Sequence, residues 1–280
     1  MWVKDGEKLK LRRLSLAGTG GQCLMSPPDI KDGKMPFVLY NLGGSIMNAA
    51  VGALFLALYF ICPNGSRTAP FVLLFAAVGF ITAVMNGVPM RLGAVDNDGY
   101  NALAISKSSE AAEAFWVQLS IVGQSARGVR LKDMPEEWFR VPAEESMQNS
   151  IVAVRGVLAC NRLMDEQADA LMARMLAAES GMAGIHRGLL VCDRIYIELI
   201  GVARREAIEA MLTKAQAKFM KSMRRYPSVL RTEYALALLL EKNAARAEGI
   251  RAEFEKAAKS YPYPQETESE QQLICLALNK

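Results

Sequence analysis

An uncharged apolar stretch limits what this chain can fold into more than any other feature of its sequence. Phe37–Ile61 contains no Lys, Arg, Asp or Glu, and from there to Pro89 the only such residue is Arg67. At about 1.5 Å per residue, a helix of that length spans the roughly 30 Å of hydrocarbon in a bilayer. We therefore predict that Phe37–Ile61 is a transmembrane helix, that 62–66 forms a tight turn, and that Phe71–Val88 crosses back.

The rest of the chain has a different composition. Of the 280 residues 51% are apolar, and that excess is concentrated before residue 104, whereas charges recur at nearly every helical turn in 104–280. We predict three parts: a β-hairpin and membrane-approach loop over 1–36, a transmembrane pair over 37–105 and a helical domain over 106–280. The net charge of +4 is mild and dispersed, with no basic stripe interleaved with aromatics, which argues against a nucleic-acid partner.

The flanking basic residues predict the orientation of the helix pair. The turn over 62–70 contains only Arg67, whereas residues 1–36 contain Lys4, Lys8, Lys10, Arg12, Arg13, Lys31 and Lys34. Because Lys and Arg favour the cytoplasmic side, both outer ends of the pair, and with them the C-terminal domain, are expected in the cytoplasm.

The N-terminal segment predicts two short strands. In Trp2–Leu16, apolar residues alternate imperfectly with Lys and Arg, and Asp5-Gly6 is a strong signal for a two-residue turn. We therefore expect a β-hairpin ahead of the membrane segment.

The C-terminal part has the apolar period of helices. We predict eight amphipathic helices, over Ser109–Gly128, Ser150–Met164, Glu166–Glu179, Met182–Gly201, Arg204–Arg225, Ser228–Lys242, Ala245–Tyr261 and Glu266–Leu278. The phrases Phe219–Pro227 and Phe254–Pro262 echo one another at roughly 35 residues, a period typical of tetratricopeptide-type repeats. The fold class is therefore mostly α, with an antiparallel, tetratricopeptide-like helical array. A bundle that merely packs is the alternative.

Few residues suggest chemistry. His186 is the only histidine, and it has no Cys, His or carboxylate at ligand spacing, so a surface or core role is expected. The five cysteines are odd in number and widely spaced, which is typical of small buried side chains in a reducing compartment. Asp98 lies just beyond a transmembrane segment. Asn97-Asp98-Gly99 is a common turn sequence, but an ionisable group in that setting is also a candidate for metal binding.

Two groups of residues carry a family resemblance. Gly43-Gly44-Ser45-Ile46-Met47-Asn48 resembles the GGPxxN-type motif of the site-2 protease family of intramembrane zinc metalloproteases, with Ser45 in place of proline. Asn86-Gly87-Val88-Pro89, followed by Asn97-Asp98-Gly99, resembles that family's Asn-x-x-Pro segment and Asp-Gly motif. The resemblance covers roughly residues 1–105.

The resemblance implies intramembrane proteolysis. Asp98 would be the third ligand of a Zn²⁺ ion, and Asn48 would help to position the substrate or the transition state. A zinc-activated water would hydrolyse a peptide bond of a membrane protein or peptide substrate in or near the bilayer. From the residues alone, the patch around Asn48 is also explained as a helix-packing surface of small residues and an amide.

One part of the family pattern is absent. The family takes two histidine ligands and a glutamate base from an HExxH motif, which this sequence lacks. Catalytic zinc needs three protein ligands, so this chain alone is expected to be an inactive hydrolase fragment. The expected explanation is an N-terminally incomplete sequence or a start placed too late. The alternative is a catalytically inactive membrane-anchored helical-repeat scaffold that recruits a protein partner.

Overall fold

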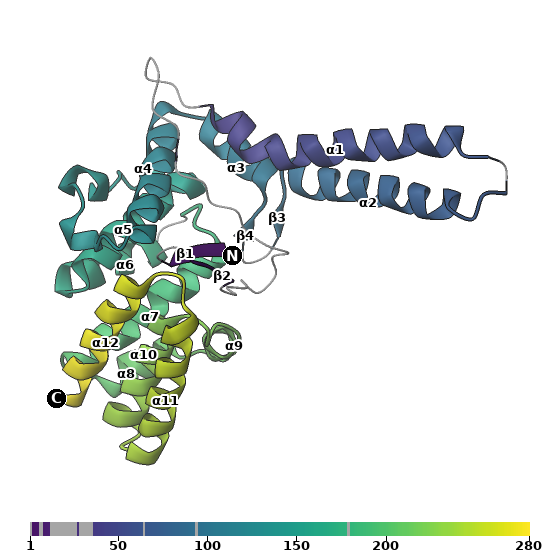
Figure 1. Ribbon diagram of the computed structural model, residues 1–280. Helices are drawn as coiled ribbons and strands as arrows, with labels where there is room; N and C mark the ends of the chain where they lie inside the picture. The colour runs from purple at the N-terminus through teal and green to yellow at the C-terminus, as the bar shows by residue number, and fades with distance from the viewer. Residues whose placement is uncertain are drawn as a thin grey trace.

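Two long helices project from a body of shorter helices (Figure 1). They are α1 (Phe37–Ile61) and α2 (Ala69–Gly87), and they run antiparallel side by side. The computed structural model describes residues 2–5, 8–11, 27, 36–63, 65–92, 95–177 and 180–280. The protein is mostly α-helical over these residues.

Both projecting helices are long and apolar enough to cross a membrane, judged by length and composition. The bounds of α1 are those predicted, and α2 begins two residues before the predicted segment. A core helix of a soluble protein would be mostly buried, whereas here Phe60 is 75% exposed and Phe71 is 66% exposed. These exposed apolar side chains are what a helix pair solvated by lipid requires.

Small residues let α1 and α2 approach closely. A Cβ atom added to Gly79 would lie 2.9 Å from the Cα atom of Gly52 and 3.0 Å from the backbone oxygen of Asn48. Beside this contact, Ala76 is fully buried and the rings of Phe55 and Phe75 stack. In lipid, such close van der Waals packing replaces the hydrophobic effect as the force that holds helices together.

Two short antiparallel strand pairs lie near the base of the helix pair (Figure 1). Strand β1 (Trp2–Asp5) pairs with β2 (Lys8–Leu11), with Trp2 opposite Leu11. The remainder of the predicted N-terminal hairpin, 12–16, lies outside the described residues. Strand β3 (Arg91–Leu92) pairs with β4 (Val95–Asp96) and connects α2 to α3.

The body consists of short helices in two lobes. The first lobe contains α3 (Asp98–Ser106), α4 (Ser109–Ala126), η1 (Leu131–Asp133), η2 (Glu136–Phe139), η3 (Ser146–Gln148), α5 (Ser150–Leu163) and α6 (Glu166–Ala177). The second lobe contains α7 (Gly184–Ile200), α8 (Arg205–Met211), α9 (Lys214–Ser222), α10 (Pro227–Ala235), a π-helical turn (Leu236–Leu240), α11 (Ala244–Ser260) and α12 (Pro264–Leu278).

The base of α1 is anchored in the first lobe. Phe37 and Tyr40 pack against a core cluster of α3, α4 and α5, and the ring of Tyr40 lies edge-on to that of Phe115, with centroids 5.5 Å apart. A second cluster joins α4, α5 and α6, and the largest cluster fills the second lobe. Six of the eight predicted helices coincide, within a few residues, with α4, α5, α6, α7, α11 and α12, and the predicted helix Ser228–Lys242 corresponds to α10 together with the π-helical turn that follows it.

The prediction of one helix over Arg204–Arg225 is wrong, because the chain breaks between α8 and α9. The Thr213 side chain caps α9 by accepting a hydrogen bond from the Gln216 backbone, at 3.1 Å. A capping Thr begins a new helix on a new axis, and the apolar period alone does not reveal this. The tetratricopeptide-like arrangement stays a prediction. The two echoed phrases, Phe219–Pro227 and Phe254–Pro262, occupy similar places: each runs from the end of one helix toward a helix with proline in its first turn.

The close contact at Gly79 can be tested by substitution. We expect Gly79→Ala to lower the free energy of unfolding by about 1–3 kcal/mol, because the new methyl group meets backbone atoms that cannot rotate away. Gly43→Ala is the matched control, since an added Cβ there meets nothing within 4 Å. Unfolding of the full chain in mixed micelles with increasing dodecyl sulfate measures both. Equal midpoints for the two variants would contradict the close packing.

Candidate functional site

The side chain of Asn97 joins the end of α2 to the beginning of α3. Its Oδ1 accepts hydrogen bonds from the backbone N–H groups of Met90 (3.0 Å) and Tyr100 (2.9 Å). Its Nδ2 donates to the backbone oxygens of Met85 (2.8 Å) and Val88 (2.6 Å). The side chain is only 7% exposed and uses all four of its hydrogen-bonding positions. It therefore caps both helix ends at once.

Gly99 brings the two helix ends into contact. A Cβ atom on Gly99 would lie 2.3 Å from the backbone oxygen of Gly87 and 2.9 Å from the nitrogen of Pro89. Gly87 in turn packs against Ser45 of α1. A Cβ atom added to Gly87 would lie 3.2 Å from the Cβ atom of Ser45. The beginning of α3 is thus held directly against the base of the helix pair.

Asp98 is the first residue of α3. Its exposed carboxylate makes no hydrogen bond or ion pair with any residue that the structure describes. The atoms packed around the beginning of α3 desolvate this carboxyl group in part, which raises its pKa above the ordinary value. The turn interpretation of Asn97-Asp98-Gly99 is wrong, because these residues are the cap and first turn of a nine-residue helix that was not predicted. An N-cap Asn and a turn Asn have the same sequence signature.

Asn48 lies deeper along the helix pair than Asp98. Its backbone oxygen faces Gly79, whereas Ser45, one turn nearer to the body, faces Gly87. The Asn48 side chain is half-buried, and no hydrogen bond connects it to Asp98 in the described part of the chain. The structure thus places Asn48 in the helix-packing patch and Asp98 at the base of the pair.

The described residues do not by themselves fit a zinc ion. Among them there is no group of three His, Cys, Asp or Glu side chains that could hold a metal. Catalytic zinc requires three protein ligands, and Asp98 supplies one. Any zinc at this position needs ligands from outside the described residues.

A second candidate site is a cavity of about 480 Å³ between the two lobes. Its size is that of pockets for small molecules. Leu158 and Arg162 of α5 line one wall, and Leu189 of α7 and Glu266 and Glu270 of α12 line others. The cavity is assembled from helices that are far apart in the sequence.

Oε1 of Gln265 and Nε of Arg162, both in residues that line this cavity, are buried polar atoms with no hydrogen-bond partner among the described residues. Gln265 is only 6% exposed, and its Nε2 donates to the backbone oxygen of Ser125, so the amide bridges the lobes. A buried acceptor and a buried donor without partners cost free energy unless something binds them.

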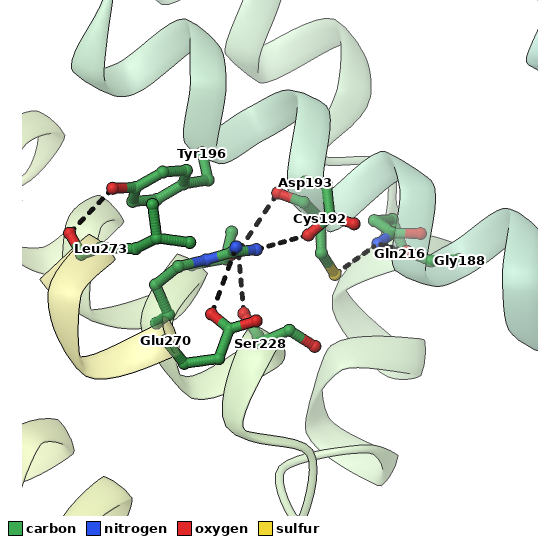
Figure 2. A network of polar contacts seen from close by, with 10 residues as sticks. Gly188, Cys192, Asp193, Tyr196, Gln216, Ser228, Glu270 and Leu273 are labelled. Carbon is green, nitrogen blue, oxygen red and sulfur yellow. Dashed lines mark hydrogen bonds and ion pairs between the residues drawn. The ribbon is translucent and has the colours of Figure 1, made fainter. Parts of the chain in front are cut away.

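A buried ionic network supports the same wall (Figure 2). Arg231 of α10 is fully buried and forms ion pairs with Asp193 of α7 and, at 3.2 Å, Glu270 of α12. Its guanidinium lies over the ring of Tyr196, whose hydroxyl donates to the backbone oxygen of Leu273. The network connects three helices, and removing one charge would leave another buried without compensation.

His186 lines the same cavity. Burial lowers the pKa of its imidazole to about 4, so the ring is neutral near neutral pH. The structure describes no hydrogen bond to this ring. The sequence predicted a surface or core role for His186. The structure specifies this role as that of a neutral side chain in the wall of a cavity.

Comparison with protein-family models, with curated proteins and with solved structures found no match. The zinc-ligand role of Asp98 and the positioning role of Asn48 therefore stay predictions. Asn97 was missed by sequence reasoning, although an Asn directly before the apolar period of 98–105 is a typical helix-start signal.

The double cap can be tested by Asn97→Ala. We expect a loss of about 2–4 kcal/mol in the free energy of unfolding, because the substitution removes a cap and leaves buried backbone groups without partners. Asn243→Ala is the control. Asn243 caps α11 through one bond to the Arg246 backbone at an exposed position, so a loss of about 1 kcal/mol is expected. Equal losses in denaturant titrations would show that Asn97 is an ordinary cap.

The cavity predicts a pH dependence. Burial raises the pKa of Glu266 from 4.5 to about 7. Between these two pKa values the carboxyl group is ionised in the unfolded chain but protonated in the folded protein. The contribution of Glu266 to the free energy of unfolding is therefore fully present below about pH 4.5 and is lost as the pH rises through about 7. We expect Glu266→Gln to reduce this loss by about 3 kcal/mol, and the exposed neighbour Glu268→Gln to leave it unchanged. Urea titrations at both ends of the range measure it; an unchanged loss in Glu266→Gln would contradict the assignment.

Proposed function

We propose that this chain is part of a membrane-embedded zinc metalloprotease of the site-2 protease type. In this proposal Asp98 supplies one zinc ligand at the base of the helix pair, and further ligands come from outside the described residues. Asn48 helps to position a peptide or membrane-protein substrate, or the transition state. Both outer ends of the pair, and the helical body, face the cytoplasm, as the basic residues of 1–36 suggest.

The observation that carries the proposal is the way Asp98 is held. Asn97 and Gly99, on either side of it, are the two most constrained residues of the junction, through four hydrogen bonds and a backbone contact. The carboxylate between them makes no bond to the described residues. A side chain that binds a metal ion needs this combination of a rigid backbone and an oxygen atom that is free to coordinate the metal.

The order of the motifs gives further support. Pro89 follows α2 and Asp98 begins α3, so these two parts of the resemblance lie together at the base of the helix pair, while Asn48 lies farther along α1. Zinc, when bound, would supply an activated water. Because the described residues include one candidate ligand only, we assign them no step of the reaction beyond holding the metal and the substrate.

Zinc content tests the proposal. The protein is produced from the gene extended upstream to the preceding in-frame start, dialysed, and analysed for metal by mass spectrometry. We expect about one zinc per chain and a loss of most of it in Asp98→Asn. Because the Asp98 carboxylate has no structural partner among the described residues, the variant should keep the circular dichroism of the parent.

Glu110→Gln is the matched control, since Glu110 is likewise an acidic residue in the first turn of a helix, α4. It should retain zinc fully. Full zinc in Asp98→Asn would refute the ligand assignment, and an extended protein without zinc would refute the metalloprotease proposal itself.

The second candidate is a catalytically inactive, membrane-anchored scaffold. The cavity between the lobes favours it, because its lining of Leu158 and Leu189 together with Arg162, Glu266 and Glu270 suits a partner with both apolar and polar groups. In that case Asn48 serves helix packing and Asp98 serves the first turn of α3. A zinc-free extended protein that folds normally would favour this function.

A further inference from the structure

Three lysines form one face of α9. Lys214, Lys218 and Lys221 are spaced i, i+4 and i+7, so their side chains lie along the same side of the helix. All three are exposed, and none makes a hydrogen bond or an ion pair with a residue that the structure describes. No acidic residue occurs between 210 and 232.

The opposite face of α9 fixes the direction of these lysines. Gln216 is buried and donates to the backbone oxygen of Gly188 on α7, at 2.9 Å. The ring of Phe219 packs so closely on Gly188 that an added Cβ there would lie 2.5 Å from it. Met220 is also buried. The helix is therefore attached through one side, and the lysine face points away from the lobe.

The basic charge of the protein gathers at this place. Residues 204–225 contain seven Lys or Arg and two Glu, a net charge of +5, whereas the whole chain has +4. Three of the arginines are engaged: Arg204 with Glu198, Arg205 with Glu209 and Arg224 with Glu233. This one segment thus has a larger net positive charge than the whole chain, and the part of it that is not engaged in ion pairs lies mostly on α9.

The fold turns α9 toward the side where the helix pair projects. In Figure 1, α9 stands on the flank of the second lobe that faces the direction of α1 and α2. It is seen end-on while α1 and α2 are seen from the side, so it runs across their direction. If the pair spans a bilayer, α9 lies along the membrane surface, with its lysine face turned away from the helical body.

We propose that the lysine face of α9 binds the anionic lipid headgroups of the bilayer that α1 and α2 span. The inference rests on insertion of the helix pair and is independent of zinc binding. Each basic residue near an anionic membrane surface contributes about a fivefold gain in binding. Because the helix pair already tethers the protein to the membrane, the local concentration of headgroups is high and three lysines suffice.

The experiment measures lysine protection in the full chain. The protein is reconstituted in nanodiscs of phosphatidylcholine alone or of phosphatidylcholine with phosphatidylglycerol, and acylation of each lysine is followed by mass spectrometry. We expect labelling of Lys214, Lys218 and Lys221 to slow by about fivefold in the anionic discs. About 1 M salt, which shortens the Debye length to about 3 Å, should restore the rate. Lys280, at the C-terminus on the other side of the body, should be labelled equally in both discs (Figure 1).

A charge reversal separates lipid binding from other contacts. Lys218→Glu should restore fast labelling of Lys214 and Lys221 in anionic discs, whereas Lys256→Glu, at an exposed position on α11, should leave them protected. Equal labelling in neutral and anionic discs would overturn the proposal. Protection that persists in high salt or in Lys218→Glu would also overturn it, and would indicate a protein contact such as a second copy.

Discussion

The buried amide of Asn97 is the interaction on which the remaining structure depends. The last turn of α2 leaves carbonyl groups without helical partners, and the first turn of α3 leaves N–H groups without them. One side chain satisfies groups of both kinds, and Gly99 allows the two helix ends to touch. The helix pair is therefore continuous with the helical body instead of being hinged to it.

This continuity links the two candidate roles of the molecule. Asp98 acquires a defined position only because its neighbours on both sides are held, and α9 faces the bilayer only because the body keeps its orientation relative to α1 and α2. The packing of Phe37 and Tyr40 in the first lobe also fixes the helix pair to the body. It adds an apolar contact at the base of α1 to the hydrogen bonds of Asn97. The inter-lobe cavity, in contrast, depends on the Arg231 network and on Gln265, far from the junction.

The sequence predicted those features that composition alone determines. Phe37–Ile61 was delimited because no charged residue interrupts it, and most body helices because their apolar period is strong. The beginnings of α3 and α9 were mispredicted for a local reason. Asn97 and Thr213 cap these two helices, but Asn97 was interpreted as part of a turn and Thr213 as the interior of one long helix. The cavity could not be predicted, because its walls combine residues such as Arg162 and Glu266 whose proximity arises only from packing. The role of Asp98, the helical repeat and the membrane orientation stay predictions.

Hydrogen exchange of the full chain in lipid nanodiscs tests the rigid junction most directly. The backbone N–H groups of Met90 and Tyr100 both donate to the Asn97 side chain. If the junction is one rigid unit, they exchange as slowly as the amide of Ile105, in the buried part of α3. If they exchange as fast as the amide of Gly65, in the exposed turn between α1 and α2, the helix pair is hinged to the body and the account is wrong.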